Sequence, residues 1–164
     1  MEKPILSPEL ADMVEFVKKN SRIMAQTVDE LAPAVFWKGS MALIMNADGN
    51  ASLFDAVRNI LREKNPDFFV LVHEAWSASP DVIDRYRKQI SPDLNSGTIP
   101  LDDRTEQIVV VFSERESLIY MTCAKITREK GKRVIGKFEE VGLLAGRNRD
   151  TGEIVHMRME WPER

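Results

Sequence analysis

The sequence predicts an α+β domain in which N-terminal helices pack on one face of a mostly antiparallel, twisted sheet. Apolar residues recur at helical spacing early in the chain, whereas from residue 106 onward short β-branched runs alternate with turn sequences. Helices followed by a run of strands are typical of the α+β class. The chain has 164 residues, which suits one domain, and no repeat, linker or low-complexity segment divides it. We therefore expect a single domain over residues 1–164.

The first predicted helix begins at Ser7, whose side chain can cap free backbone N–H groups. Pro8 suits the first helical position, and Glu9 suits the positive end of the helix dipole. The pattern is expected to end at Pro33, which cannot continue a helix. The apolar positions at helical spacing are Leu10, Met13, Val14, Val17, Ile23, Met24, Val28 and Leu31.

The next segment, residues 34–45, fits a strand and a buried helix about equally, and Lys38-Gly39 is a possible break within it. Residues 46–50 form a turn sequence. A second amphipathic helix then runs from a capping sequence at Ser52 to Asn65-Pro66.

The stretch 67–76, DFFVLVHEAW, is the strand around which the fold is expected to form. Its apolar run, residues 68–72, predicts burial on both faces. Side chains alternate between the faces of a strand, so His73 lies on one face while Glu74 and Trp76 lie on the other. A core strand that ends in these three residues is the most site-like feature of the sequence.

A short helix is expected over residues 79–86, and residues 91–105 have no periodicity. A loop of that length in a compact domain is usually functional or mobile. Three strands follow, over residues 106–112, 118–127 and 134–141. The last strand alternates, with four side chains toward the core: Val155, Met157, Met159 and Trp161.

Composition narrows the class of function. A net charge of −3 and a pI near 5.5 provide no general case for binding nucleic acid or an anionic membrane. Cys123 is the one cysteine, so an internal disulfide is impossible, which fits a reducing compartment. The N-terminus has no apolar signal segment, and no apolar run approaches the roughly 18 residues of a membrane span. We expect a cytoplasmic protein without a cofactor.

Topology predicts one polar cluster. If strand 67–76 pairs antiparallel with strand 106–113, the end of the first strand lies beside the start of the second. Carboxylates with a histidine can hold a divalent ion or carry out acid–base chemistry. The candidate residues of this cluster are His73, Glu74, Trp76, Asp102, Asp103, Arg104 and Glu106.

The favoured interpretation of this cluster is structural: Arg104 pairs with Glu74 or Glu106 and holds the long loop. The alternatives are a binding pocket and a metal-dependent hydrolase or nuclease, whose ion the carboxylates of the cluster would hold. A zinc-protease signature is absent, because Ser77 stands where the second histidine of that motif would be.

A basic cluster lies on the predicted hairpin 125–137, with Lys130, Lys132 and Arg133 at its tip. Such a tip can follow a phosphate backbone. Lysines on a hairpin also prevent edge-to-edge aggregation, and this structural role is favoured. Cys123 with His156 is a conceivable nucleophile and base, but the position of Cys123 within a strand predicts a buried, inert thiol.

Most of the methionines fall on faces predicted to be core, and they are interpreted as packing residues. These are Met13, Met24, Met41, Met45, Met121, Met157 and Met159. Trp37 is the residue we would expect at a dimer interface, if part of the apolar surface forms one.

The residues Glu74-Ala75-Trp76, followed by a variable loop and by Asp103-Arg104-x-Glu106, resemble a pattern in uncharacterised α+β proteins of bacterial and phage genomes. The resemblance covers about residues 68–140. It implies no activity, and it implies that Glu74, Trp76, Arg104 and Glu106 form a recurring unit.

The leading hypothesis is a non-enzymatic interaction or oligomerisation module that binds a protein partner or itself, with a homodimer possible. The second hypothesis is the metal-dependent hydrolase or nuclease. The third, nucleic-acid binding through the basic hairpin, is not favoured.

Overall fold

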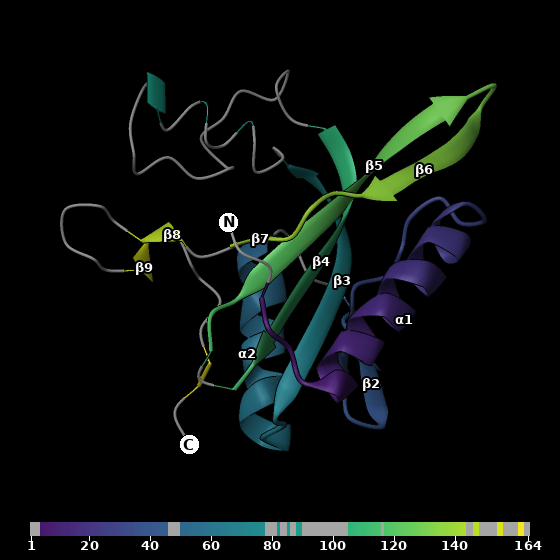
Figure 1. Cartoon of the computed structure of the whole chain (residues 1–164). Helices are drawn as coiled ribbons and strands as arrows, with labels where there is room; N and C mark the ends of the chain where they lie inside the picture. The colour runs from purple at the N-terminus through teal and green to yellow at the C-terminus, as the bar shows by residue number, and fades with distance from the viewer. Residues whose placement is uncertain are drawn as a thin grey trace.

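The computed structural model describes residues 4–45, 50–77, 82, 85, 88–89, 105–115, 117–143, 146–147, 154–155 and 161–162 (Figure 1). The two long helices are α1 (Pro8–Ala25) and α2 (Asn50–Lys64). The strands of the main sheet are β1 (Ala34–Trp37), β2 (Ser40–Leu43), β3 (Phe68–Ser77), β4 (Thr105–Glu114), β5 (Tyr120–Glu129), β6 (Lys132–Phe138) and β7 (Gly142–Leu143). A separate short pair consists of β8 (Gly146–Arg147) and β9 (Ile154–Val155).

The main sheet has the strand order β2-β1-β3-β4-β5-β6, with β7 paired to β5, and the pairing of every neighbouring pair is antiparallel. The longest ladder joins β3 to β4 over ten residue pairs, from Phe68↔Glu114 to Ser77↔Thr105. The α+β class and the antiparallel pairing of these two strands are therefore confirmed.

The two helices lie on opposite faces of this sheet (Figure 1). Leu10, Val14 and Val17 of α1 share a core cluster with Phe68, Val70 and Val72. Leu53, Val57 and Leu61 of α2 pack instead with the alternate side chains Phe69 and Leu71. The prediction of helices on one face therefore holds for α1 and is wrong for α2. The apolar run of β3 is continuous, so both faces of the sheet need a cover.

The first helix begins as expected and ends early. Ser7 Oγ accepts a hydrogen bond from the backbone N–H of Leu10 at 3.3 Å, and Pro8 is the first helical residue. The helix ends at Ala25, well before Pro33. Val28 and Leu31 lie in the irregular connection between α1 and β1. They keep the apolar spacing of the helix because they also pack into the α1-face core.

Two hairpins define the segments whose structure the sequence did not predict in detail. Residues 34–45 contain the β1–β2 hairpin, whose turn at Lys38-Gly39 uses the positive φ of 72° at Gly39. The β5–β6 hairpin turns at Lys130 and Gly131, with φ angles of 52° and 79°, the signature of a two-residue type I′ turn. A bulge then places both Gly136 and Lys137 opposite Lys125.

Several predicted features lie outside the described residues, namely the short helix 79–86 as a whole, the loop 91–104, Met157 and Met159. Trp161 is described, and it packs against the α2-face core as predicted. Its ring meets Phe69 edge-on with a centroid separation of 5.2 Å, and its Nε1–H donates to Ser113 Oγ at 2.9 Å. The guanidinium of Arg115 covers the ring at 4.7 Å from the centroid.

Within the part of the chain that the structure describes, no helix has the length and apolarity needed to cross a bilayer.

The contacts of Trp161 predict a graded loss of stability. Replacing Trp161 with Ala removes the ring from Phe69 and Arg115 and should lower the free energy of unfolding by about 2 kcal/mol, because the side chain is only partly buried. Replacing it with Phe keeps an aromatic ring and removes the bond to Ser113, for a loss of about 1 kcal/mol. Urea unfolding followed by circular dichroism measures both, and an unchanged midpoint for Trp161→Ala would contradict the packing.

Candidate functional site

The predicted polar cluster lies where the end of β3 meets the start of β4. Trp76 pairs with Glu106, and Glu74 pairs with Ile108, as the topological argument required. Asp102, Asp103 and Arg104 lie outside the described residues, and of Trp76 only the backbone pairing is described. For the remaining members, His73, Glu74 and Glu106, the observed positions can be compared with the predicted cluster.

His73 and Glu74 face opposite sides of the sheet. His73 is buried on the α2 face, where its ring meets Phe54 edge-on at 6.3 Å between centroids. Burial lowers the pKa of His73 to about 4, so the imidazole is neutral near pH 7. Its Nε2 is buried without a hydrogen-bond partner among the described residues. The sheet therefore separates His73 from Glu74, and the two side chains do not act together.

Glu74 forms a buried ion pair with Arg133 on the α1 face. Each side chain is 7% exposed. Glu74 Oε1 accepts hydrogen bonds from Arg133 Nη2 and, at 3.1 Å, from the backbone N–H of Leu31. Arg133 Nη1 donates to the carbonyl of Val28 at 2.8 Å. The pair thus joins β3, β6 and the connection between α1 and β1.

Glu106 is paired with Arg128 of β5, with 3.0 Å between the carboxylate Oε2 and Nη1. This pair is more open, since the Arg128 side chain is 52% exposed. The sequence interpretation expected Arg104 to pair with Glu74 or Glu106 and to hold the long loop. The observed arginine partners of these two carboxylates come instead from the β5–β6 hairpin, and Arg104 lies outside the described residues.

The described residues do not assemble a metal site. No group of three or more His, Cys, Asp or Glu side chains converges within this part of the chain. Glu74 and Glu106 already neutralise arginines, and His73 contacts Phe54 on the other face. For the hydrolase hypothesis, the remaining candidate metal ligands of the cluster are Asp102 and Asp103, which lie outside the described residues.

The basic hairpin is less basic than its sequence suggests. Arg133 is buried against Glu74, so its inclusion in a nucleic-acid surface with Lys130 and Lys132 is wrong. Arg128 is paired with Glu106. Lys130 and Lys132 remain exposed at the tip, where they suit the protection of an edge strand.

Cys123 of β5 is buried in the α2-face core, and burial raises the pKa of its thiol to about 12. The thiol is therefore protonated and inert near neutral pH. The prediction of a structural cysteine is confirmed.

An exposed apolar surface, which the sequence interpretation did not identify, covers the outer side of α1 and the strand β2. We call it the α1–β2 surface. The side chains that form it are each 50% to 56% exposed: Phe16, Met24, Met41 and Leu43. Phe16 meets Phe36 of β1 edge-on at 6.4 Å, which joins the helix to the strands. Met45, directly after β2, is also exposed.

The prediction that the methionines are core residues is therefore wrong for Met24, Met41 and Met45, and correct for Met121. Trp37, the expected interface residue, packs against the α2-face core. A usable signal was present in α1: Phe16 and Met24 are eight residues apart, about two turns, and neither lies on the buried stripe of Leu10 and Val17.

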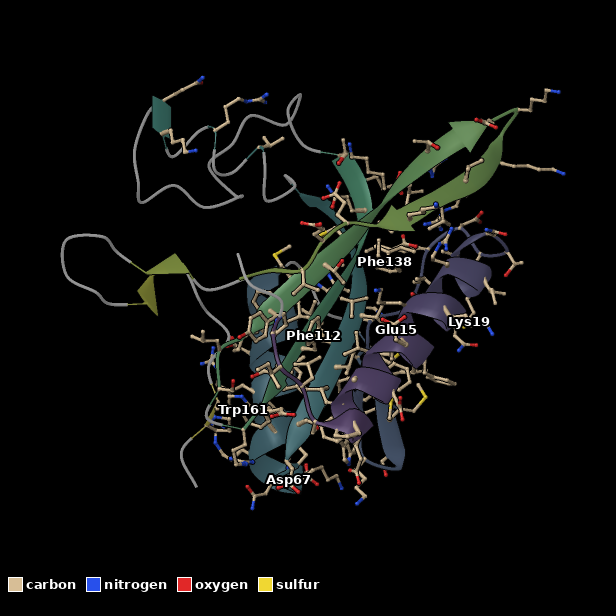
Figure 2. All side chains as sticks on the ribbon, viewed as in Figure 1. Glu15, Lys19, Asp67, Phe112, Phe138 and Trp161 are labelled. Atoms are coloured by element: carbon tan, nitrogen blue, oxygen red, sulfur yellow. The ribbon has the colours of Figure 1, made fainter. Side chains whose placement is uncertain are left out.

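A cleft of about 450 Å³ lies on the other side of α1, toward β6. Figure 2 shows Phe138 close to the half of the helix that carries Glu15 and Lys19. Lys18 lies over the Phe138 ring at 5.5 Å and pairs with Glu15 at 3.3 Å, so its charge is engaged. The residues of the cleft are Glu15, Lys18, Lys19, Arg22, Ile23, Gln26 and Phe138.

No family model matches the chain, and comparisons with curated proteins and with solved structures find no match. The resemblance to proteins of bacterial and phage genomes therefore stays a prediction.

The buried ion pair of Glu74 and Arg133 predicts that a single isosteric substitution strongly reduces stability. Glu74→Gln leaves Arg133 charged and buried without a counter-ion, and should cost about 3–5 kcal/mol of folding free energy. Glu106→Gln is the matched control, because it breaks a more open pair and should cost less than about 1 kcal/mol. Denaturant unfolding at pH 7 measures both. Equal, small losses would show that the Glu74 pair is not a structural requirement.

His73 predicts a specific loss of stability in acid. Its pKa is lowered from 6.5 to about 4 in the folded chain, so below pH 6.5 the unfolded chain binds the proton first. Stability should fall as the pH drops from 6.5 to 4, by about 3 kcal/mol from this group. His73→Phe should remove that part of the slope, whereas His156→Gln should keep it. Chemical unfolding at several pH values tests this, and identical slopes for the wild type and His73→Phe would refute it.

Proposed function

We propose that the chain is a non-enzymatic protein-interaction module of the cytoplasm and that its binding surface is the α1–β2 surface. The observation that supports this is the exposure of large apolar side chains on adjacent elements, Phe16 on α1 and Met41 and Leu43 on β2. Contiguous exposed apolar patches on small proteins usually mark sites of protein association.

The described members of the polar cluster support the same proposal, because they are engaged in structural contacts. The carboxylates of Glu74 and Glu106 are used in ion pairs, and His73 is buried on the other face. Cys123 has a raised pKa and no access to solvent. These described groups serve packing and stability. Met41 and Leu43, in contrast, are apolar and about half exposed, so packing within the domain does not account for their apolar side chains.

The apolar strand is surrounded by charged residues. β2 has the sequence Ser-Met-Ala-Leu, and the exposed ion pair of Lys38 with Glu9, 3.3 Å apart, lies at the hairpin turn. On α1, the exposed Asp12 and Lys19 lie one turn from Phe16. An apolar centre with a charged rim is the usual arrangement of a protein-binding surface.

Charge substitutions test the proposal. Phe16→Glu and Leu43→Glu, both at exposed positions, should leave the melting temperature within a few degrees of the wild type. Each should weaken association with protein, whether with itself or with another chain, by at least tenfold. Sedimentation and immobilised-chain capture measure this. The matched control is Lys132→Glu, on the exposed tip of the basic hairpin, which should leave association unchanged.

The proposal is wrong if the wild type neither self-associates nor captures a protein that the two α1–β2 variants fail to capture.

A further inference from the structure

Among the described strands, β2 ends the main sheet, and no described strand pairs with its outer edge. The N–H of Ile44 donates to the carbonyl of Pro33 at 2.8 Å, so Ile44 forms a hydrogen-bonded pair with the chain before β1. Such pairs recur at every second residue of an antiparallel ladder, so Ala42 also bonds toward β1. The backbone N–H and C=O groups of Met41 and Leu43 therefore point away from the sheet.

The two edges of the sheet differ in their protection. At one edge, β6 carries the exposed Lys132 and Lys137, and its bulge interrupts the ladder. At the other edge, β2 has no charged residue, no proline and no bulge. Charged side chains, proline and bulges are among the features that prevent an edge strand from pairing with another chain. The edge at β2 has none of these three, and within the described part of the chain its shortness, four residues, is its one protection.

We propose that β2 pairs antiparallel with β2 of a second copy of this chain, about a two-fold axis midway between Ala42 and its equivalent, so that the two main sheets become one. The inference rests on the proposed function, because it names the partner of the α1–β2 surface. A two-fold interface must be self-complementary. Met41 then exchanges backbone hydrogen bonds with Leu43 of the second copy, and Leu43 does so with Met41 of that copy, while Ala42 faces its own equivalent.

The side chains support this partner. Met41 and Leu43 stand opposite Phe36 and Ala34, which belong to the α1-face core, so both side chains lie on the α1 face. An axis perpendicular to the sheet brings the α1 helices of both copies to the same face. Phe16 of each copy then approaches the apolar residues of the other across the joined strands.

The available area fits a weak dimer. Four side chains of this surface are about half exposed, and a half-exposed large apolar side chain offers roughly 100 Å². Two copies therefore bury at most about 800 Å² of side-chain surface, less than the roughly 1,000 Å² of a stable specific interface. The backbone bonds of the new strand pair add to it. A dimer that dissociates on dilution in the micromolar range is expected.

Disulfide trapping tests the register. Ala42 and its equivalent form a pair without backbone hydrogen bonds, in which the Cα atoms are about 4.5 Å apart, within the range of a disulfide. Ala42→Cys should therefore form a covalent dimer on mild oxidation, seen by non-reducing electrophoresis. The native Cys123 is buried and does not interfere. Val134→Cys is the matched control, at an exposed position on the protected β6 edge, and should give no covalent dimer.

Proline at the outer edge provides a second, independent test. Met41→Pro removes an N–H that points outward and leaves the β1–β2 bonds of Ala42 intact. The variant should stay folded by circular dichroism and become monomeric in sedimentation at concentrations where the wild type is a dimer.

The inference is overturned if the wild type is monomeric at high micromolar concentration and Ala42→Cys cross-links no faster than Val134→Cys. If Leu43→Glu nevertheless loses capture of a different protein, the surface has another partner and the proposed function stands. If no α1–β2 variant changes any association, both the inference and the proposed function fail.

Discussion

The buried ion pair of Glu74 and Arg133 is the constraint on which the rest of the arrangement depends. Glu74 belongs to the central strand β3, and Arg133 belongs to the edge strand β6. Their remaining hydrogen-bonding groups bind the backbone of Val28 and Leu31. Because a buried charge must be paired, this contact fixes the twisted β5–β6 hairpin and the path from α1 into β1 together. The position of β2 follows from that path.

The sheet is covered on both faces, and this decides where a functional surface can lie. The central strands β3 and β4 present apolar side chains to α1 and to α2 alternately. A polar cluster at the end of β3 is consequently divided between two faces, with the neutral His73 on one side and Glu74 on the other. The exposed apolar groups lie instead at the β2 edge and on the outer side of α1, where neither helix covers them.

Much of the architecture was predictable from local patterns. The cap at Ser7, the helix that ends at Asn65-Pro66 and the turn at Gly131 each follow from short-range chemistry. The pairing of β3 with β4 followed from their order and composition. The candidate site was predicted less well, because His73 and Glu74 lie at the same strand end but on opposite faces of the sheet. Arg104 was expected to pair with Glu74 or Glu106, whereas the observed partner of Glu74 is Arg133, 59 residues away.

The sequence by itself determined the α+β class, the two-sided burial of β3 and the inert character of Cys123, because these depend on apolar content within one element. Only the tertiary structure decided which arginine neutralises Glu74 and which methionines remain outside the core. Met41 and Met121 look alike as sequence, but one lies on an edge strand and the other in the middle of the sheet. Exposure depends on how many neighbours the fold places around a residue, and that number is set by contacts distant in the chain.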